Sequence, residues 1–245
     1  MCQYRSGEAV RRGDGIELLT VADSDSHITT RKAHGIREDA GGGESYHTPV
    51  EFAPHGDLAD LDAYTLIYDA GRPKWLSDAM EESLIGQFRR CVQRDLDVGR
   101  ICRTDSLRLD KATAVSEGVT IEAGENADLS SVVSVAKGVT INVGGCVYLG
   151  SVVSVAKGLT VSAGGCVNLS SVVNLAEGVT INAGGYVYLD SVTDLAEGVR
   201  INAGGYVHLD SVTAVPEGVT INAGGQVCLR QYGPDRGPHF CQREN

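Results

Sequence analysis

Four histidines lie between residues 27 and 55, and several carboxylates lie in or beside the same stretch. The histidines are His27, His34, His47 and His55, and the carboxylates are Asp23, Asp25, Asp39 and Glu51. Imidazole and carboxylate are the ligands that zinc and iron sites use. No pair shows the close spacing of an HExxH helix, so solvated loop side chains are the simpler interpretation, and a metal site here is the alternative.

Aromatic residues recur at steps of twenty or of two residues in the second half of the chain. They are Tyr148, Tyr186, Tyr188, Tyr206 and His208. If these positions face solvent on neighbouring turns of chain, their side chains lie within about 5 Å of one another. Exposed aromatic clusters are favoured anchors for a partner protein. The same rings could instead only stabilise the sheet by cross-strand stacking.

Acidic residues also recur in this half of the chain. Those predicted to bind a partner are Asp190, Asp210, Glu177, Glu197 and Glu217. Between residues 169 and 228 these five acids and Asp194 are accompanied by a single Lys or Arg residue, Arg200. An acidic surface of this kind can occupy the basic groove of a nucleic-acid-binding protein, although a solvated edge explains the same residues.

These residues are positioned by six consecutive 20-residue repeats between Leu109 and Cys228. Within one repeat the apolar residues alternate in two short runs, as in Val179-Thr180-Ile181 and Tyr186-Val187-Tyr188-Leu189, which predicts two strands and a third apolar side. A single coil cannot bury its apolar row alone, so the repeats must stack. The predicted fold is mainly β: a parallel β-solenoid of six coils, with Val139, Val179 and Val219 in one interior row.

The solenoid has a row of threonines with a polar residue two positions further on, and glycines on both sides of its first strand. The threonines are Thr120, Thr140, Thr160, Thr180 and Thr220, followed in later coils by Asn142, Ser162, Asn182, Asn202 and Asn222. A flat threonine row is similar to that of ice-binding solenoids, but Arg200 interrupts it and asparagine replaces the second threonine. The glycines, such as Gly178 and Gly184, are expected where φ is positive or where the next coil comes too close for a side chain.

Both ends of the solenoid need a cover, because an open sheet edge favours aggregation. Residues 75–108 are predicted to form an amphipathic helix over 75–96 and a linker, with the helix across the first coil. Residues 230–245 break the repeat with proline and glycine and could fold Tyr232 and Phe240 over the last coil. The solenoid itself is assigned to residues 109–229.

Residues 1–74 are predicted to form a small β-rich domain before this helix. Its strand-like runs are EAVRRGDGIELLTV, HITTRKA, YHTPVEF and AYTLIYD, and AGGGES at residues 40–45 is expected to be a loop. That glycine-rich loop is not a phosphate-binding loop, because no GxxxxGK[ST] motif is present.

Charge and cysteine usage restrict the functional classes. The net charge of −11 argues against sequence-independent binding to DNA or to anionic membranes. No apolar run follows the charged residues at the start of the sequence, so no secretory signal peptide is expected. The seven cysteines have no CxxC pairing, so we expect free thiols, including Cys146 and Cys166, in a cytoplasmic protein. A zinc cap of Cys228, His239 and Cys241 is a minor alternative.

The repeats, LDSVTAVPEGVTINAGGQVC in particular, resemble the 20-residue LPEGVTxxxGGxVxL repeats of bacterial and phage proteins, which are similar to bacterial leucine-rich repeats. The resemblance covers about half of the chain and implies a phage or bacterial interaction protein. It implies no catalytic residues. The proline of the motif is present only at Pro216, which favours a straighter solenoid over a strongly curved horseshoe.

The sequence therefore predicts a non-enzymatic interaction module without a cofactor, which binds and inhibits a host or bacterial protein, for example a defence or nucleic-acid enzyme. No direct contact with nucleic acid or membrane is expected, and a homodimer stays open. The alternative is a small metal-dependent enzyme in the amino-terminal domain with the solenoid as its scaffold.

Overall fold

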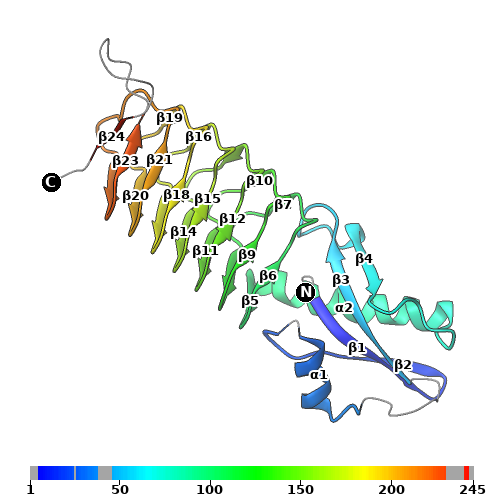
Figure 1. Cartoon of the computed structure of the whole chain (residues 1–245). Helices are drawn as coiled ribbons and strands as arrows, with labels where there is room; N and C mark the ends of the chain where they lie inside the picture. Colours follow the sequence, from blue (N-terminus) through cyan, green and yellow to red (C-terminus); the bar gives the residue numbers. More distant parts are fainter. Residues whose placement is uncertain (1–4, 25, 38–45, 230–239, 243–245) are drawn as a thin grey trace.

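The computed structural model describes residues 5–24, 26–37 and 46–229, together with the backbone of residues 240–242. A stacked solenoid forms most of the molecule, and a small sheet with two helices lies at its first coil (Figure 1). This arrangement confirms the predicted mainly β fold with a parallel β-solenoid.

The first five repeats each contribute three strands rather than the predicted two, because their third apolar side also pairs from coil to coil. The seven-stranded sheet contains β5 (Arg100–Arg103), β8 (Thr120–Ala123), β11 (Thr140–Val143), β14 (Thr160–Ala163), β17 (Thr180–Ala183), β20 (Arg200–Ala203) and β22 (Thr220–Ala223). The sheet that follows it in each coil contains β6 (Leu107–Arg108), β9 (Ala127–Asp128), β12 (Val147–Tyr148), β15 (Val167–Asn168), β18 (Val187–Tyr188), β21 (Val207–Leu209), β23 (Val227–Leu229) and β24 (Phe240–Gln242). The third sheet contains β7 (Ala114–Val115), β10 (Ser134–Val135), β13 (Ser154–Val155), β16 (Asn174–Leu175) and β19 (Asp194–Leu195).

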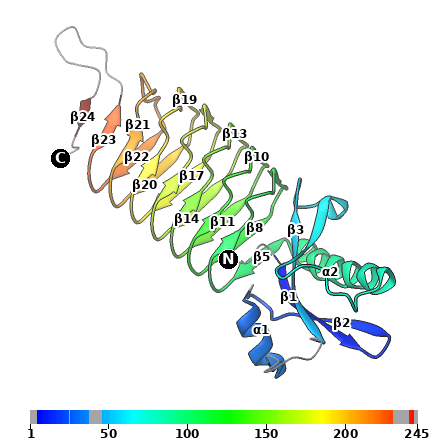
Figure 2. The ribbon, with the colours of Figure 1, turned by 45° about the vertical axis from the view of Figure 1, so that its right-hand side comes forward.

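Residues twenty apart pair in parallel and in register. Thr140 lies opposite Thr160, and Ile181 lies opposite Ile201. Val139 and Val179 are fully buried, and Val219 in the last coil is partly buried against the same core. The predicted interior row is therefore confirmed, and the strands of successive coils lie side by side along the solenoid (Figure 2).

The two predicted reasons for glycine apply at different corners of the coil. Gly178 has a φ of 71°, in the left-handed region that favours glycine. Gly184 has no such φ, but a Cβ there would lie 2.2 Å from the carbonyl oxygen of Gly164 in the preceding coil. Stacking itself therefore excludes a side chain at this second corner.

The ladder begins nine residues before the first sequence repeat. Arg100–Arg103 and Leu107–Arg108 pair with the strands of the first repeat, so they form a partial coil where a linker was expected. This partial coil follows directly from helix α2 (Asp78–Val98), which is capped by Ser77 and ends at Gly99. The predicted helix at this position is confirmed.

The amino-terminal sheet is antiparallel with strand order β2-β1-β3-β4. Its elements are β1 (Arg5–Arg12), β2 (Gly15–Leu19), β3 (His47–Pro54), the short 3-10 helix η1 (Leu61–Ala63) and β4 (Tyr64–Tyr68). One face packs on α2, where Phe52 stacks on Phe88 with centroids 5.3 Å apart. The buried residues of this face and of the solenoid form one continuous core.

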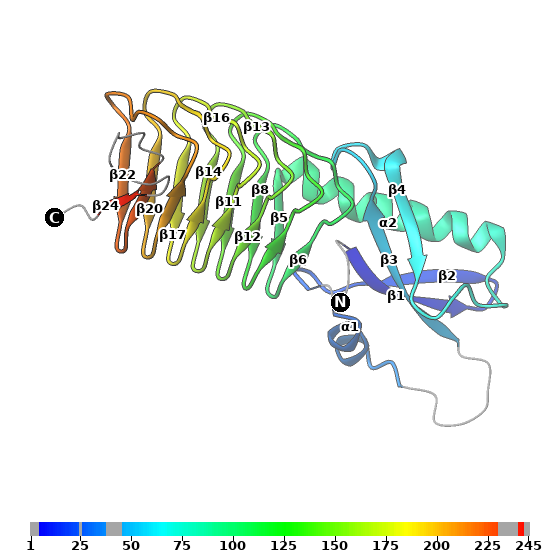
Figure 3. The same cartoon turned by 45° about the horizontal axis from the view of Figure 1, so that its top comes forward.

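The run HITTRKA is a helix, so the prediction of a strand there was wrong. Helix α1 (His27–His34) begins after Ser26, whose hydroxyl accepts the amide of Thr29, and ends at Gly35 with a φ of 65°. The β-branched residues Ile28, Thr29 and Thr30 favour a strand, but the two capping residues and contact with β1 favour the helix. Figure 3 shows α1 below β1 and away from α2.

The loop between β3 and β4 covers the first coil together with α2. The Leu58 amide donates to the Ala114 carbonyl and the Thr113 amide donates to the Gly56 carbonyl. The Ser116 hydroxyl donates to the Asp57 carboxylate at 2.7 Å. These bonds attach the small sheet to the solenoid and satisfy groups of the first full coil.

At the other end β24 pairs antiparallel with β23, so the predicted repeat break is followed by one reversed strand. Tyr232 and the side chain of Phe240 lie outside the described residues, as does the predicted loop at 40–45. Cys228 is disulfide-bonded, which corrects the expectation that all cysteines are free thiols and removes it from the zinc cap. Cys91, Cys102, Cys146 and Cys166 are free. Among the described residues no helix is long and apolar enough to cross a bilayer.

Candidate functional site

Four aromatic side chains gather on the outside of the fourth and fifth repeats, and we call Tyr186, Tyr188, Tyr206 and His208 the tyrosine patch. Tyr186 and Tyr206 stack with centroids 5.5 Å apart and planes at 4°. Tyr188 and His208 stack at 5.1 Å and 15°. Tyr186 and Tyr206 are each 39% exposed, so the stacking leaves much of both rings in contact with solvent.

The glycine-rich corner of the next coil supports these rings. A Cβ at Gly205 would lie 3.1 Å from the Cδ1 atom of Tyr186, and one at Gly225 would lie 3.2 Å from that of Tyr206. Each tyrosine therefore leans over the second glycine of the following coil. Tyr148, also predicted for this face, lies two coils before Tyr188 with Asn168 between them, so it is not part of the stack.

Two carboxylates flank the tyrosine patch. Asp190 and Asp210 follow the same strands, and His208 Nδ1 lies 4.0 Å from Asp210 Oδ2. The three side chains could place one ligand atom each within 4.8 Å of one another. Burial raises the pKa of Asp190, the neighbouring Asp210 adds to the rise, and His208 opposes it. The aromatic and acidic predictions thus coincide at these two coils.

The structure places the predicted glutamates elsewhere. Glu177, Glu197 and Glu217 lie in the turns that precede β17, β20 and β22, whereas the tyrosine patch follows those strands. The glutamates and the tyrosines therefore lie at opposite ends of the seven-stranded sheet's strands, not in one cluster. Glu177 is also paired with Lys157 at 2.7 Å, and both side chains are more than half exposed.

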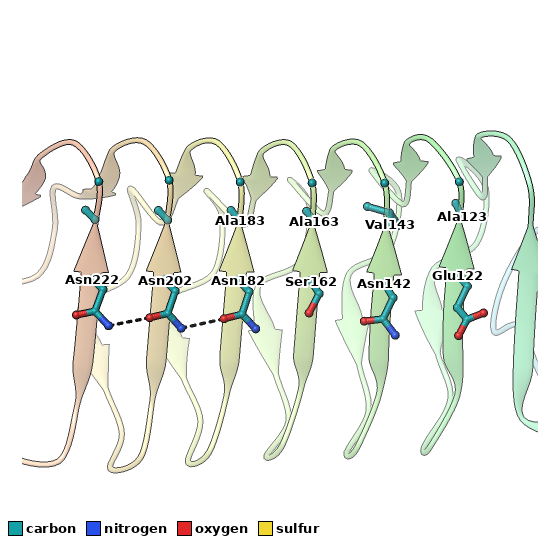
Figure 4. A pocket seen from close by; sticks show the side chains of 18 of the residues that line it. Glu122, Ala123, Asn142, Val143, Ser162, Ala163, Asn182, Ala183, Asn202 and Asn222 are labelled. Atoms are coloured by element: carbon teal, nitrogen blue, oxygen red, sulfur yellow. Dashed lines mark hydrogen bonds between the residues drawn. The ribbon is translucent and has the colours of Figure 1, made fainter.

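A shallow groove of about 1010 Å³ runs along the seven-stranded sheet. Its lining repeats in each coil as a polar residue, a small apolar residue and a glycine, such as Asn182, Ala183 and Gly184 (Figure 4). Asn202 Nδ2 donates to Asn182 Oδ1, and Asn222 Nδ2 donates to Asn202 Oδ1, both at 2.8 Å. Beyond Glu122 the lining of later coils carries no charge, which distinguishes it from the acidic rows.

A second candidate site lies between α1 and the amino-terminal sheet. Helix and sheet usually meet through apolar side chains, but here the buried residues are polar. Glu8 is fully buried, and His27, His47 and Glu51 are between 6% and 8% exposed. Buried titratable groups that converge beside a cavity make a candidate functional site. We call Glu8, His27, His47, Glu51 and Asp69 the carboxylate–histidine cluster.

Short distances connect the members of this cluster. His47 Nδ1 lies 2.9 Å from Glu8 Oε2, and Arg31 Nε donates to Glu8 Oε1 at 2.6 Å. His27 Nε2 lies 3.2 Å from Asp69 Oδ2 and 3.8 Å from Glu51 Oε1. Burial raises the pKa of Asp69, which His27 opposes and Glu51 and Glu8 reinforce. The cluster therefore concentrates negative charge around one imidazole.

The structure brings together three of the residues that the sequence indicated as ligands, namely His27, His47 and Glu51. His34 is exposed and contacts the carbonyl of Thr20, and His55 and Asp23 are exposed as well. Asp25 and Asp39 lie outside the described residues. Sequence reasoning missed Glu8 and Asp69. The only sign of Glu8 in the sequence was its place as the charged first residue of the strand-like run EAVRRGDGIELLTV.

A cavity of about 500 Å³ adjoins this cluster. His47 lines it, together with the loop after β4, which includes Arg72, Lys74 and Trp75. Asp69 directly precedes that loop, and its side chain is 39% exposed. The cluster is therefore open to solvent at Asp69 and closed at Glu8.

Comparison with protein-family models, curated proteins and solved structures finds no match to this chain. The resemblance to LPEGVTxxxGGxVxL repeats therefore remains a prediction, while the 20-residue solenoid is shown by the coordinates.

Proposed function

We propose that this chain is a non-enzymatic interaction module that docks a partner protein on the tyrosine patch. The supporting observation is that Tyr186 and Tyr206 remain 39% exposed although they stack on each other. Tyrosine gives a large contact area at low entropic cost, and stacking holds both rings in one orientation before binding. A docking partner then orders few side chains.

The partner on this proposal has a basic surface. Asp190 and Asp210 border the patch, and the far coils carry further acids against Arg200 alone. Complementary charge accelerates association and selects among partners. The repeat resemblance supports the finer proposal that the chain is a phage-type protein that inhibits a bacterial host protein, for example a nucleic-acid enzyme with a basic groove.

A photo-reactive amino acid placed at Tyr206 tests this proposal in extract from the source cell. We expect one dominant cross-linked protein, competed by excess wild-type chain and lost when Asp190 and Asp210 are replaced by lysine. The same probe at Ser134, an exposed position on the third sheet, is the matched control. Equal cross-linking from Ser134, or no competition by wild type, would show that the patch is not a docking surface.

Location in the cytoplasm is part of the same proposal, and the cysteines give it a direct test. Disulfides persist in oxidising compartments, so the bonded Cys228 argues against this location and the four free cysteines argue for it. Differential alkylation of the protein in intact cells reports the state of Cys228. A reduced Cys228 in the cell supports the cytoplasm, and an oxidised one contradicts it.

The rival function is a metal-dependent enzyme in the amino-terminal domain. It is favoured by one specific observation: the carboxylate–histidine cluster adjoins a cavity large enough for a small substrate. Replacing Tyr186 and Tyr206 by alanine separates the two functions, since it should abolish partner binding and leave an activity in the amino-terminal domain unchanged.

A further inference from the structure

The carboxylate–histidine cluster brings three carboxylates and two imidazoles together in a largely buried place. Glu8 is fully buried, Glu51 and His27 are 6% and 8% exposed, and the Asp69 side chain reaches solvent with 39% of its surface exposed. Charged groups that are buried in proteins are paired with opposite charges or coordinate metal ions.

The elements that hold the cluster place three ligand atoms around one point. Glu51 is on β3, Asp69 follows β4, and His27 is the first residue of α1, fixed by the Ser26 cap. β3 and β4 are neighbours in the sheet, with Glu51 opposite Ile67, so the two carboxylates come from adjacent strands. The three ligand atoms all lie within 4.8 Å of one another.

Their spacing fits a single ion. With metal–ligand bonds of about 2.0–2.2 Å, two ligands of one zinc ion lie roughly 3–4 Å apart. The His27 Nε2 atom is 3.2 Å from Asp69 and 3.8 Å from Glu51. Two carboxylates and one imidazole match zinc and related borderline cations better than magnesium or calcium, which prefer oxygen alone.

We propose that His27, Glu51 and Asp69 bind one divalent transition-metal cation of the zinc class. Glu8 lies behind them and is held by Arg31 and His47, with its Oε1 atom 3.7 Å from the Nδ1 atom of His27. A carboxylate at this distance behind a ligating histidine orients the ring and increases its basicity. Asp69 faces solvent, so an ion can enter from that side and keep a water molecule. This site is independent of the tyrosine patch.

Titration calorimetry of the full chain after chelation tests the proposal with Zn²⁺, Co²⁺, Mn²⁺, Mg²⁺ and Ca²⁺. We expect one Zn²⁺ or Co²⁺ per chain and weaker binding of the other ions. Asp69→Asn and His27→Gln should each weaken binding by at least about 10-fold. Asp14→Asn, an exposed aspartate in the β1–β2 turn, should change nothing. Asp69 is 39% exposed, so Asp69→Asn keeps the test valid if His27→Gln does not fold.

Two other groups of this chain could bind the same ions, and the design distinguishes them. Free thiolates such as Cys146 and Cys166 would give an intense cobalt–thiolate absorption band, which nitrogen and oxygen ligands do not. If the ion were held by Asp190, His208 and Asp210, the His208→Ala variant would no longer bind it. The proposal is overturned if the wild type binds none of these ions, if only Mg²⁺ or Ca²⁺ binds, or if Asp69→Asn binds as tightly as the wild type.

Discussion

Gly184→Ala should destabilise the solenoid by about 2–3 kcal/mol, because the coils are stacked too closely for a Cβ at this corner. The new atom would lie 2.2 Å from the carbonyl oxygen of Gly164, so the two coils must separate by about 1 Å to restore contact at normal distances. Two ladder hydrogen bonds lie at that point, from the Gly184 amide to Ala163 and from the Gly185 amide to Gly165, both 2.9 Å.

The magnitude follows from three contributions. Two weakened hydrogen bonds cost about 2 kcal/mol, and overpacking against backbone costs at least about 1 kcal/mol. Replacing glycine removes unfolded-state freedom and returns about 0.4–1 kcal/mol. Urea unfolding followed by far-UV circular dichroism measures the result. For a slope of about 2 kcal/mol per molar urea, the midpoint should fall by about 1 M.

Two other glycines of the solenoid are matched controls. A Cβ at Gly150 would be 3.7 Å from Asn168, an ordinary contact, so Gly150→Ala should stay within about 0.5 kcal/mol of wild type. Gly178→Ala meets no atom within 4 Å but has a φ of 71°, so it should cost about 1–2 kcal/mol. Equal midpoints for Gly184→Ala and Gly150→Ala would refute the close stacking on which all outer columns depend.

Three further predictions concern side-chain contacts. Asn202→Ala should cost about 1 kcal/mol and Asn222→Ala roughly half as much, because they remove two and one ladder hydrogen bonds respectively, and equal costs in urea unfolding would contradict this. Burial raises the pKa of Asp190 above 3.8, so the folded state binds this proton more tightly than the unfolded state does. The folded protein therefore loses stability as the pH rises from 3.8 through the raised pKa. Asp190→Asn should therefore raise the melting temperature at neutral pH and not below pH 3.8, and a gain independent of pH would contradict the assignment. The Nη2 atom of Arg5 lies 2.7 Å from both carboxylate oxygens of Asp95, and the pair is nearly buried. Asp95→Asn breaks this pair and should lower the free energy of unfolding by about 3 kcal/mol, measured by thermal unfolding. The control Asp97→Asn should be nearly neutral.

The 20-residue repeat by itself determines the solenoid. A period of twenty residues with alternating Val, Ile and Leu leaves one way to bury the apolar row, which is to stack like positions in register. The same logic placed Tyr186 beside Tyr206 and Asp190 beside Asp210, because columns on the outside follow from the register inside. For these residues, two positions that are twenty residues apart in the sequence are adjacent in space.

The amino-terminal domain has no such period, so its sequence determines less of its fold. Thr29 and Thr30 suggested a strand, yet two capping residues and contact with β1 made a helix. The same fold brought His27 next to Asp69, which is 42 residues away in sequence, counted from the two residue numbers. Only tertiary structure could join them, because a local pattern carries no information on which strand of an antiparallel sheet a helix will cover.

The corners of the coil show both kinds of determination in a single residue type. That glycine recurs twice in each coil could be read from the sequence, and so could the two physical reasons for it. Which reason applies to which glycine depended on backbone angles and on the distance between coils. Period and polarity determined what stacks in this protein, and the three-dimensional path of the chain decided which distant charges share a buried site.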